Sequence, residues 1–446
     1  MKRKGIPILL FFCFLFALIF PLCTMPVCAA EPTGFGDIND PERIKNAKKW
    51  EGVGEKYLVA DESQVYIFAH GIGTESEPFL LESVEDVARL AANVRYTGEY
   101  GTGESTNYYG KYFLLTCDLD FENKPWYGIG GAESVAWNDG AMFQGIFDGG
   151  GHVIYNFNLK DTPMNGFFSY VGRGATIRNL GIASGTVTVT STARVGLLIG
   201  GAQYGVTIEN CFCNADLICD SAGTETCAGG LIGEIRNAPS TVSTLRNCSF
   251  GGTVTLAAGS GSTAHRIGGL VGSVSGGAVE VRGCSYSGTI SVVCSHAETS
   301  ARETAAIGTL IGSVTETARC DIAYCYSAGL LQSTGTADCV GAVGYAGTET
   351  RGNLVFGTDN RLETVLSGKT DAFVEIGFLP ESDSVGTVDR YDGGGTTRVI
   401  VHQEGGCRSS FGTVGTVLAG AVVLTVGQWK KRRRIRRRMT RQSEAR

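Results

Sequence analysis

The stretch Gly-Leu-Leu-Ile-Gly at residues 196–200 recurs along the chain and decides the fold. Its clear copies are Gly-Gly-Leu-Ile-Gly from Gly229, Gly-Gly-Leu-Val-Gly from Gly268 and Gly-Thr-Leu-Ile-Gly from Gly308, and its weaker copies are Asn-Gly-Phe-Phe-Ser from Asn165 and Val-Gly-Ala-Val-Gly from Val340. The spacings from start to start are 31, 33, 39, 40 and 32 residues. A period of this size is typical of a protein built from stacked repeats.

Two further segments follow the copies. A second motif lies 12 to 16 residues after each copy as far as Gly308: Ile177-Arg-Asn-Leu, Ile208-Glu-Asn-Cys, Leu245-Arg-Asn-Cys, Val281-Arg-Gly-Cys and Ile322-Ala-Tyr-Cys. A third segment alternates apolar and polar residues, as in Thr186-Val-Thr-Val-Thr, Gly252-Thr-Val-Thr-Leu and Gly288-Thr-Ile-Ser-Val. Three short strand signals per unit, separated by Gly, Asn and Ser turns and without a helical period, predict one triangular coil of a parallel β-helix.

We therefore expect an all-β fold, a right-handed parallel β-helix of about six to seven coils over residues 112–365. Coils stacked about 4.8 Å apart would form a column roughly 30 Å long. Equivalent residues would then form ladders in its interior. We expect one ladder of leucines (Leu198, Leu231, Leu270 and Leu310) and one of cysteines (Cys211, Cys248, Cys284 and Cys325).

The regions on either side of the repeats have other compositions. After an N-terminal lead-in over residues 30–81, apolar residues at helical spacing predict a capping helix and loop over 82–111, with Ser83 and Asp86 at the helix start. Such a cap would cover the open end of the solenoid. After residue 365 the repeat fades, and the Gly-, Ser- and Thr-rich stretch 366–408 reads as a stalk or linker.

Both ends of the chain carry membrane signals. Residues 1–29 show the basic, apolar and small-residue order of a secretory signal peptide. Residues 409–429 carry no charge and would reach roughly 31 Å as a helix, which just spans a bilayer. The basic segment 430–446 holds ten Lys and Arg against one acidic residue, so it should stay in the cytoplasm. We expect a single-pass type I protein of the cell membrane with an extracellular ectodomain.

Charge limits the partners of that ectodomain. Without the signal peptide and the tail, 25 basic residues face 43 acidic ones, a net charge of about −18. Nucleic acid and anionic lipid need a basic surface, so neither is expected to bind the ectodomain. The basic tail suits anionic lipid of the inner leaflet.

The repeat resembles the GLUG motif of extracellular bacterial surface proteins, named for its Gly-Leu-hydrophobic-Gly core. Residues 229–254 and 268–292 carry the closest copies, whereas Gly283 replaces the usual Asn of the second motif and Val340 replaces the first Gly of its copy. The resemblance covers roughly residues 70–350. It implies a β-solenoid at the cell surface and brings no catalytic residues. GLUG motifs also precede the catalytic region of IgA-specific zinc metalloproteases.

Candidates for chemistry are few. The five histidines, His70, His152, His265, His296 and His402, are isolated, so the two-His zinc signature of a metalloprotease is absent from the sequence. There is no Cys-x-x-Cys pair, and we expect no metal or other cofactor; Cys213 with Cys219 or Cys320 with Cys339 are conceivable disulfides. The best carboxylate cluster is Asp118, Asp120 and Asp148, for which ordinary turn chemistry is the alternative to catalysis.

These observations favour a noncatalytic binding, adhesion or presentation module, with no catalytic, cofactor or metal site. Its ligand would be a host or cell-wall glycan or protein, whose identity the sequence leaves open along with the oligomeric state. Loops at 237–243, 257–265 and 296–304 are the candidate contacts, because insertions cluster there. The alternatives are a membrane-tethered polysaccharide lyase or hydrolase, which would need carboxylates gathered on one face, and a structural spacer without a ligand.

Overall fold

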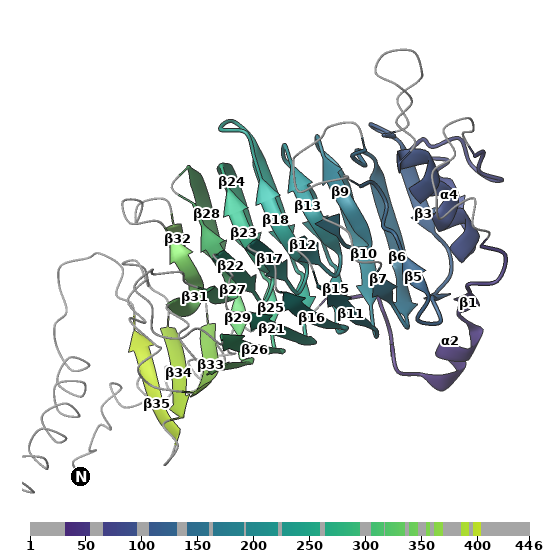
Figure 1. Cartoon of the computed structure of the whole chain (residues 1–446). Helices are drawn as coiled ribbons and strands as arrows, with labels where there is room; N and C mark the ends of the chain where they lie inside the picture. Colours follow the sequence, from purple (N-terminus) through teal and green to yellow (C-terminus); the bar gives the residue numbers. More distant parts are fainter. Residues whose placement is uncertain are drawn as a thin grey trace, which may run out of the picture. The chain divides into compact units, whose positions relative to one another are not determined.

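The computed structural model describes residues 32–53, 66–95, 107–131, 141–159, 164–190, 193–221, 225–258, 264–294, 305–315, 317–334, 339–346, 354–356, 361–368, 385–391 and 396–402. These residues form a parallel β-solenoid, whose coils are stacked from right to left in Figure 1 in the order of the sequence. Six successive coils within the described part carry strands on all three faces, in line with the expected number.

The first face is one parallel ladder that runs the length of the solenoid. Its strands are β2 (Phe79–Leu81), β3 (Tyr112–Leu115), β6 (Ile146–Tyr155), β10 (Thr176–Ile182), β14 (Thr207–Glu209), β19 (Val242–Arg246), β24 (Gly277–Arg282), β28 (Ala318–Ala323) and β32 (Leu354–Phe356). Short strands continue several of these past a corner: β4 (Leu119–Asp120), β15 (Phe212–Cys213), β20 (Ser249–Phe250), β25 (Ser285–Tyr286) and β29 (Tyr326–Ser327).

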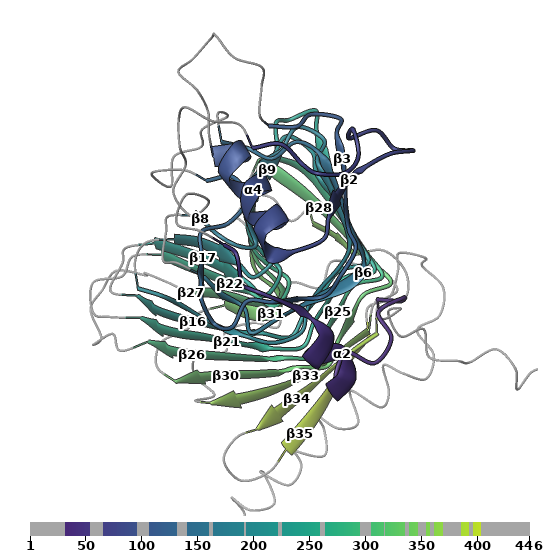
Figure 2. The same cartoon turned by 90° about the vertical axis from the view of Figure 1, so that its right-hand side faces the viewer.

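The second face holds the segments that alternate polar and apolar residues. Its main strands are β11 (Thr186–Val189), β16 (Asp216–Ser221), β21 (Thr253–Ala258), β26 (Thr289–Cys294), β30 (Leu330–Thr334) and β33 (Arg361–Gly368), while β5 (Pro125–Trp126) and β7 (Asn158–Leu159) pair beside them. Figure 2 views the solenoid down the axis on which the coils are stacked, and it shows these strands on one side.

The third face is a separate sheet in which most coils contribute two strands joined by a sharp bend. These strands are β8 (Met164–Asn165), β9 (Phe168–Gly172), β12 (Ala193–Gly196), β13 (Ile199–Gln203), β17 (Glu225–Gly229), β18 (Ile232–Arg236), β22 (Ala264–Gly268), β23 (Val271–Ser275), β27 (Ala305–Val314) and β31 (Cys339–Ala346). Three of the four clear copies lie at this bend, with Gly196, Gly229 and Gly268 each ending one strand. The fourth copy, from Gly308, lies within the continuous strand β27.

The motif glycines are required because backbone fills the space that a side chain would need. A Cβ on Gly229 would lie 2.0 Å from the carbonyl oxygen of Ile232 in its own coil. A Cβ on Gly233 would lie 2.5 Å from the carbonyl oxygen of Gly200 and from the amide nitrogen of Val195, both in the preceding coil. The two glycines therefore permit the sharp bend and the close stacking of successive bends.

A second corner repeats at the Asn of the second motif. Asn179, Asn210, Asn247 and Gly283 have φ angles of 53°, 52°, 49° and 61°, and Tyr324 follows at 58°. Asn and Gly tolerate this left-handed conformation, so Gly283 keeps the corner although it departs from the motif. The Asn210 amide also donates to the side-chain oxygen of Asn179 at 2.8 Å, which links neighbouring coils.

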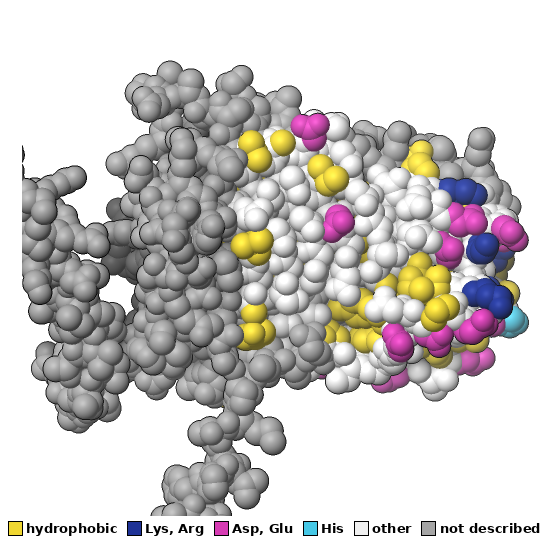
Figure 3. All heavy atoms as spheres, turned by 90° about the horizontal axis from the view of Figure 1, so that it is seen from below, with side chains coloured by type: hydrophobic (Ala, Val, Ile, Leu, Met, Phe, Trp, Pro, Cys, Tyr) yellow, Lys and Arg dark blue, Asp and Glu magenta, His cyan; other side chains and the backbone are white. Residues whose placement is uncertain are grey.

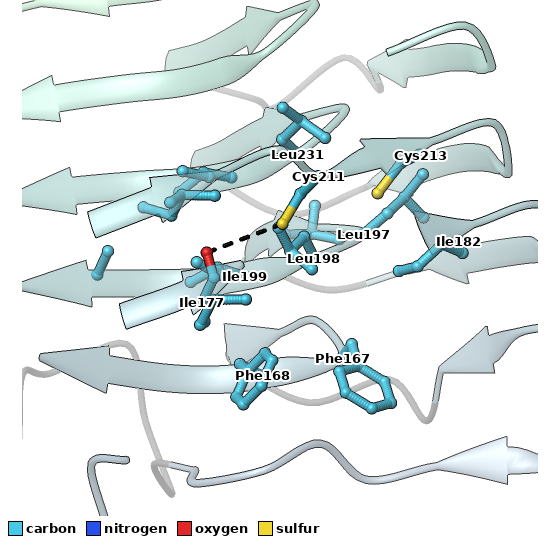
Figure 4. Close-up of a cluster of buried hydrophobic side chains, with 14 of the residues drawn as sticks. Phe167, Phe168, Ile177, Ile182, Leu197, Leu198, Ile199, Cys211, Cys213 and Leu231 are labelled. Carbon is cyan, nitrogen blue, oxygen red and sulfur yellow. Dashed lines mark hydrogen bonds between the residues drawn. The ribbon is translucent and has the colours of Figure 1, made fainter. Parts of the chain in front are cut away.

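The interior contains the predicted ladders. Leu198, Leu231, Leu270 and Leu310 are fully buried, and the four repeated cysteines are buried too. Figure 4 shows Leu198, Ile177 and Cys211 gathered in this interior, where the Cys211 thiol lies 3.8 Å from the carbonyl oxygen of Ile177. Nearer the N-terminal end the core holds aromatic rings: Phe168 pairs with Ile199 of the next coil, and its ring centroid lies 5.2 Å from that of Phe167, edge to face.

Helix α4 (Val84–Arg95) covers the N-terminal end of the core, as Figure 2 shows. Val84, Val87, Leu90 and Val94 are fully buried on its inner side. The helix starts as expected, since the Asp86 amide donates to the Ser83 hydroxyl at 3.1 Å and the Asp86 carboxylate accepts from the Glu82 amide at 3.0 Å. The arrangement is a variant of the capping box in which the amide that donates to Asp86 belongs to Glu82, the residue before the cap.

The expected stalk over 366–408 is wrong in part. Strand β33 extends to Gly368, β34 (Val385–Tyr391) pairs in parallel with it, and β35 (Thr396–His402) pairs antiparallel with β34. The alternating residues of β34 and β35 on either side of Asp392-Gly393 are a hairpin signal, which the Gly and Ser content obscured. Strand β2 likewise extends the first face upstream of residue 112.

The two weak copies also differ from the expected alignment. Gly341 pairs with Gly308 although Val340 was expected there, and Asn165 pairs with Val195, which places Gly166 beside Gly196. Both weak copies have one residue fewer between this glycine and the apolar residue that pairs in the next strand. Each therefore keeps the glycine of the bend and shortens the segment after it.

The segments 1–29, 409–429 and 430–446 lie outside the described residues. Within the part that the structure does describe, helices are too short or too polar to cross a bilayer.

Substitution of a motif glycine should destabilise the solenoid. We expect Gly233→Ala to lower the free energy of unfolding by about 2–3 kcal/mol, because the new methyl group meets backbone atoms on two sides. Urea unfolding of the purified chain in detergent, followed by circular dichroism, measures the change. Gly131→Ala is the matched control, since its Cβ would meet only the Arg95 side chain at 3.8 Å. Equal unfolding midpoints for the two variants would contradict the account of the bend.

Candidate functional site

Asp118, the first of the three candidate carboxylates, holds the N-terminal segment against the solenoid. Its carboxylate accepts hydrogen bonds from Arg43 Nε at 2.6 Å and Arg43 Nη2 at 2.9 Å, and from the Val153 amide at 2.9 Å. His152 Nδ1 lies 3.2 Å away. Arg43 belongs to helix α2 (Pro41–Asn46) and also donates to the carbonyl oxygen of Gly151 at 3.1 Å. The Asp118 group is therefore fully engaged within the chain.

These contacts lower the pKa of Asp118. Burial alone would raise the pKa, but the hydrogen bonds from His152, Arg43 and the Val153 amide outweigh it and hold it well below the usual range. The carboxylate is therefore ionised at neutral pH. It acts as the anchor of the docked segment.

Further contacts extend this docking across several coils. Thr33 and Asn210 exchange two hydrogen bonds, at 2.7 and 2.9 Å, and the Phe35 ring meets Phe212 edge to face with centroids 4.8 Å apart. The Tyr155 hydroxyl donates to the carbonyl oxygen of Ile38 at 2.9 Å. Strand β1 (Lys48–Lys49) then joins β4 in parallel. Residues 32–49 of the lead-in are thus part of the folded solenoid.

Asp120 and Asp148 stabilise turns. The Asp120 carboxylate accepts from the Glu122 amide at 2.9 Å and the Asn156 side chain at 2.7 Å. The Asp148 carboxylate accepts from the Gly150 amide at 2.9 Å and Arg178 Nε at 2.8 Å. This is the turn chemistry named as the alternative to catalysis.

The three carboxylates do not gather at one point. Asp148 lies near the start of β6, opposite Leu114, whereas Asp120 pairs with Tyr155 at the far end of the same strand. Among the described residues, no three His, Cys, Asp or Glu side chains are placed to hold a metal ion. His70 contacts Glu82 and His265 is buried in β22, while His296 and the His402 side chain lie outside the description.

The nine cysteines whose side chains the structure describes are all present as thiols. They include Cys213, Cys219 and Cys320, so neither conceivable disulfide is formed. Burial raises the pKa of Cys227 to about 12 and that of the partly exposed Cys117 to about 11, and it places the pKa of Cys248 well above the usual value. Buried, protonated thiols are poor nucleophiles.

The loop at 237–243 is a pinned turn. The Asn237 side-chain oxygen accepts from the Gly205 amide and from the Ser243 hydroxyl, both at 2.9 Å, and its amide donates to the carbonyl oxygen of Ala278 at 2.7 Å. Asn237 and Ser243 are buried. The expectation of a contact loop is therefore wrong for these two residues, since their polar groups are used within the chain. Residues 259–263 and 296–304 of the other two loops lie outside the described part.

The faces of the solenoid differ in what they present outward. The first face carries charge of both signs, including Arg178, Glu209, Arg246 and Arg282 in consecutive coils. On the third face, polar side chains bond to one another across the bend. Glu234 is buried and forms an ion pair with Arg194 of the preceding coil, and its carboxylate accepts a hydrogen bond from the Ser275 hydroxyl at 2.6 Å. Neither face offers a flat, uniform surface.

The second face is flat and rich in hydroxyl groups. Strands β11, β16, β21, β26 and β30 pair without any shift of register. Val187, Leu217, Val254, Ile290 and Leu331 point inward in one row, while residues on either side alternate outward. The outward side chains are Thr186, Thr188, Asp216, Ile218, Asp220, Thr253, Thr255, Ala257, Thr289, Ser291, Val293, Leu330 and Gln332. We call this set the hydroxyl face.

Figure 3 shows uncharged polar groups and backbone over much of this side of the described molecule, interspersed with hydrophobic side chains, and most of the charged side chains gathered at the N-terminal end. Asp216 and Asp220 are the charged members of the hydroxyl face, and it includes no Lys or Arg. Sequence reasoning recognised the alternation but overlooked the surface it creates. Aligning the third segments of successive repeats would have revealed it.

Comparison with known proteins gives short matches. No family model and no solved structure matches the chain. Over 148 residues, 32% of the chain, it is 34% identical to a protein of Evansella cellulosilytica named as a Gly-rich membrane protein, and the match covers 15% of that protein. Over 192 residues, 41% of the chain, it is 24% identical to Halomucin of Haloquadratum walsbyi, of which the match covers 2%. The chain spans only a small fraction of either relative.

Loss of the Asp118 charge should loosen the N-terminal segment. We expect Asp118→Asn to destabilise the docked segment by about 2 kcal/mol at pH 7, since it leaves the mostly buried Arg43 without its charged partner. Because the folded pKa lies below the unfolded value of about 3.9, the difference from wild type should shrink as the pH falls below about 4. The measurement is the rate of proteolytic cleavage within residues 32–53. Glu42→Gln removes an exposed ion pair and should change nothing.

The thiols should be protected from alkylation in the folded chain. At pH 8 we expect iodoacetamide to leave Cys211, Cys213 and Cys248 unmodified, and to label Cys117 first among the nine described cysteines. Mass spectrometry of peptides after native labelling, compared with labelling in urea, measures this. Rapid native modification of Cys248 would contradict the burial of the cysteine ladder.

Proposed function

We propose that the chain is a GLUG-type surface protein, anchored by residues 409–429 with its solenoid outside the cell, and that it is a noncatalytic binding module. The noncatalytic assignment rests on the hydrogen bonds of the candidate carboxylates, because Asp118, Asp120 and Asp148 each accept hydrogen bonds from groups of their own chain. A glycan-cleaving site would need two such groups free on opposite sides of one bond.

The geometry of the repeat motif supports the GLUG assignment. The Gly-Leu-hydrophobic-Gly core has glycine at its first and last positions, where Gly230 and Gly233 leave no room for a side chain, and its leucine, Leu231, is buried in the core. Sequence and packing thus impose the same pattern. Other proteins with this motif should contain the same bend.

Support for the anchor comes from the sequence of the two ends. An apolar segment of bilayer length followed by a basic cluster favours one span with the tail inside. One relative that matches about a third of the chain is named as a membrane protein. The secretory signal expected at residues 1–29 supports a location of the solenoid outside the cell.

Binding and turnover can be tested in one experiment. We expect the purified chain, held in detergent micelles, to bind members of a glycan and matrix-protein array saturably and to leave the bound polysaccharides uncleaved. Reducing-end release measured in the same wells detects cleavage. Cleavage that is lost in Asp148→Ala would overturn the noncatalytic proposal in favour of the enzyme. Absence of binding to any array member would favour a spacer.

A further inference from the structure

The hydroxyl face is periodic in two directions. Along each strand, successive outward residues are two positions apart, which is a distance of about 6.6 Å. Equivalent outward residues of neighbouring coils are about 4.8 Å apart. Thr253, Thr255, Thr289 and Ser291 form a block of four hydroxyl groups on the adjacent strands β21 and β26, in register as Thr253 with Thr289 and Thr255 with Ser291. Thr186 and Thr188 add two hydroxyl groups on β11, which is separated from this block by β16, whose outward side chains are Asp216, Ile218 and Asp220.

The face is also rigid. Threonine has few side-chain rotamers in a strand, and the apolar residues between the hydroxyl-bearing ones are locked in the core, as Val254 and Ile290 are. A rigid array loses little conformational entropy when a ligand binds. The buried side chains of these strands thus hold the outward hydroxyl groups in fixed positions before a ligand binds.

A ligand that contacts successive coils in the same way must itself repeat at the coil spacing. One pyranose residue of an extended polysaccharide has about that length, so a glycan lying along the solenoid could place one sugar on each coil. Each threonine or serine hydroxyl donates one hydrogen bond and accepts two, which matches the hydroxyl groups of a sugar. The threonine methyl groups would meet the C–H surface of the ring.

Charge selects among polysaccharides. The hydroxyl face has no cationic side chain, and Asp216 and Asp220 would repel carboxylate or sulfate groups. The Asp216 carboxylate accepts from the Thr253 amide at 2.9 Å, which fixes this negative charge at the surface. An uncharged glycan therefore fits, whereas a polyanionic one does not.

We propose that the hydroxyl face binds an uncharged, extended polysaccharide along the solenoid axis, with one sugar residue per coil. This inference rests on the proposed binding function and names its surface and ligand class. It places recognition on the rigid strands, whereas the sequence had suggested the variable loops.

The test measures retention of the full chain in detergent micelles on cellulose and chitin, with polygalacturonate as the polyanionic comparison. We expect wild type to bind at least one of the two uncharged polymers and to ignore polygalacturonate. The double variant Thr255→Lys with Ser291→Lys should bind about tenfold more weakly or worse, because two long side chains interrupt the array. The milder pair Thr255→Val with Ser291→Ala removes only the hydroxyl groups and should also weaken binding.

The matched control is Thr207→Lys with Thr244→Lys, which adds the same charges to adjacent strands of the first face. It should bind as wild type does, and circular dichroism verifies the fold of every variant. Undiminished binding by both hydroxyl-face pairs would overturn the surface assignment. Binding only to other members of the array would overturn the ligand class and leave the binding function standing. Self-association that the hydroxyl-face variants abolish would assign the face to a second copy instead.

Discussion

The hydrogen bonds between successive coils constrain everything else in this structure. Each strand of a face pairs in parallel with its equivalent in the next coil, so every coil must bring the same residues to the same height. The repeat length nevertheless varies from 31 to 40 residues. The extra residues fall between strands, for example between β18 and β19 and between β26 and β27, where the register is not disturbed.

The same constraint explains the residues that recur. At the bend of the third face, two backbone layers approach so closely that a methyl group on Gly233 or Gly272 would overlap main-chain atoms of the preceding coil. At the other corner the chain needs a left-handed residue, which Asn supplies while its side chain bonds to the Asn of the neighbouring coil. Glycine and asparagine are thus fixed by geometry, whereas the core positions require only volume and apolarity. This is why the residues of one core row, Phe168, Ile199, Ile232 and Val271, can differ in size along the solenoid.

Repetition made the fold predictable, and its absence explains the errors. The strand order, the leucine and cysteine ladders and the capping box at Ser83 could all be predicted from spacing, because each pattern is local or recurs. The partner of Asp118 could not, since Arg43 lies 75 residues upstream in a segment that occurs once. The hairpin of β34 and β35 was missed because its alternation occurs once and lies in a Gly-rich region. The candidate carboxylates looked available for the same reason: their partners are scattered over several coils.

A solenoid has few ways to be specific, because its surface repeats as its core does. Here the third face is closed by its own bend, and the first is covered at its N-terminal corner by the docked lead-in and elsewhere carries charge of both signs. The second face alone combines an unbroken register with a near absence of charge among the described strands. An inward row of apolar residues on this face demands alternation, and alternation leaves every second residue facing solvent. Threonine and serine at outward positions of β11, β21 and β26 maintain strand propensity without adding charge, so the requirements of folding are compatible with a block of hydroxyl groups on this face. What remains for function to determine is which positions depart from that array, and the acidic residues Asp216 and Asp220 are such departures.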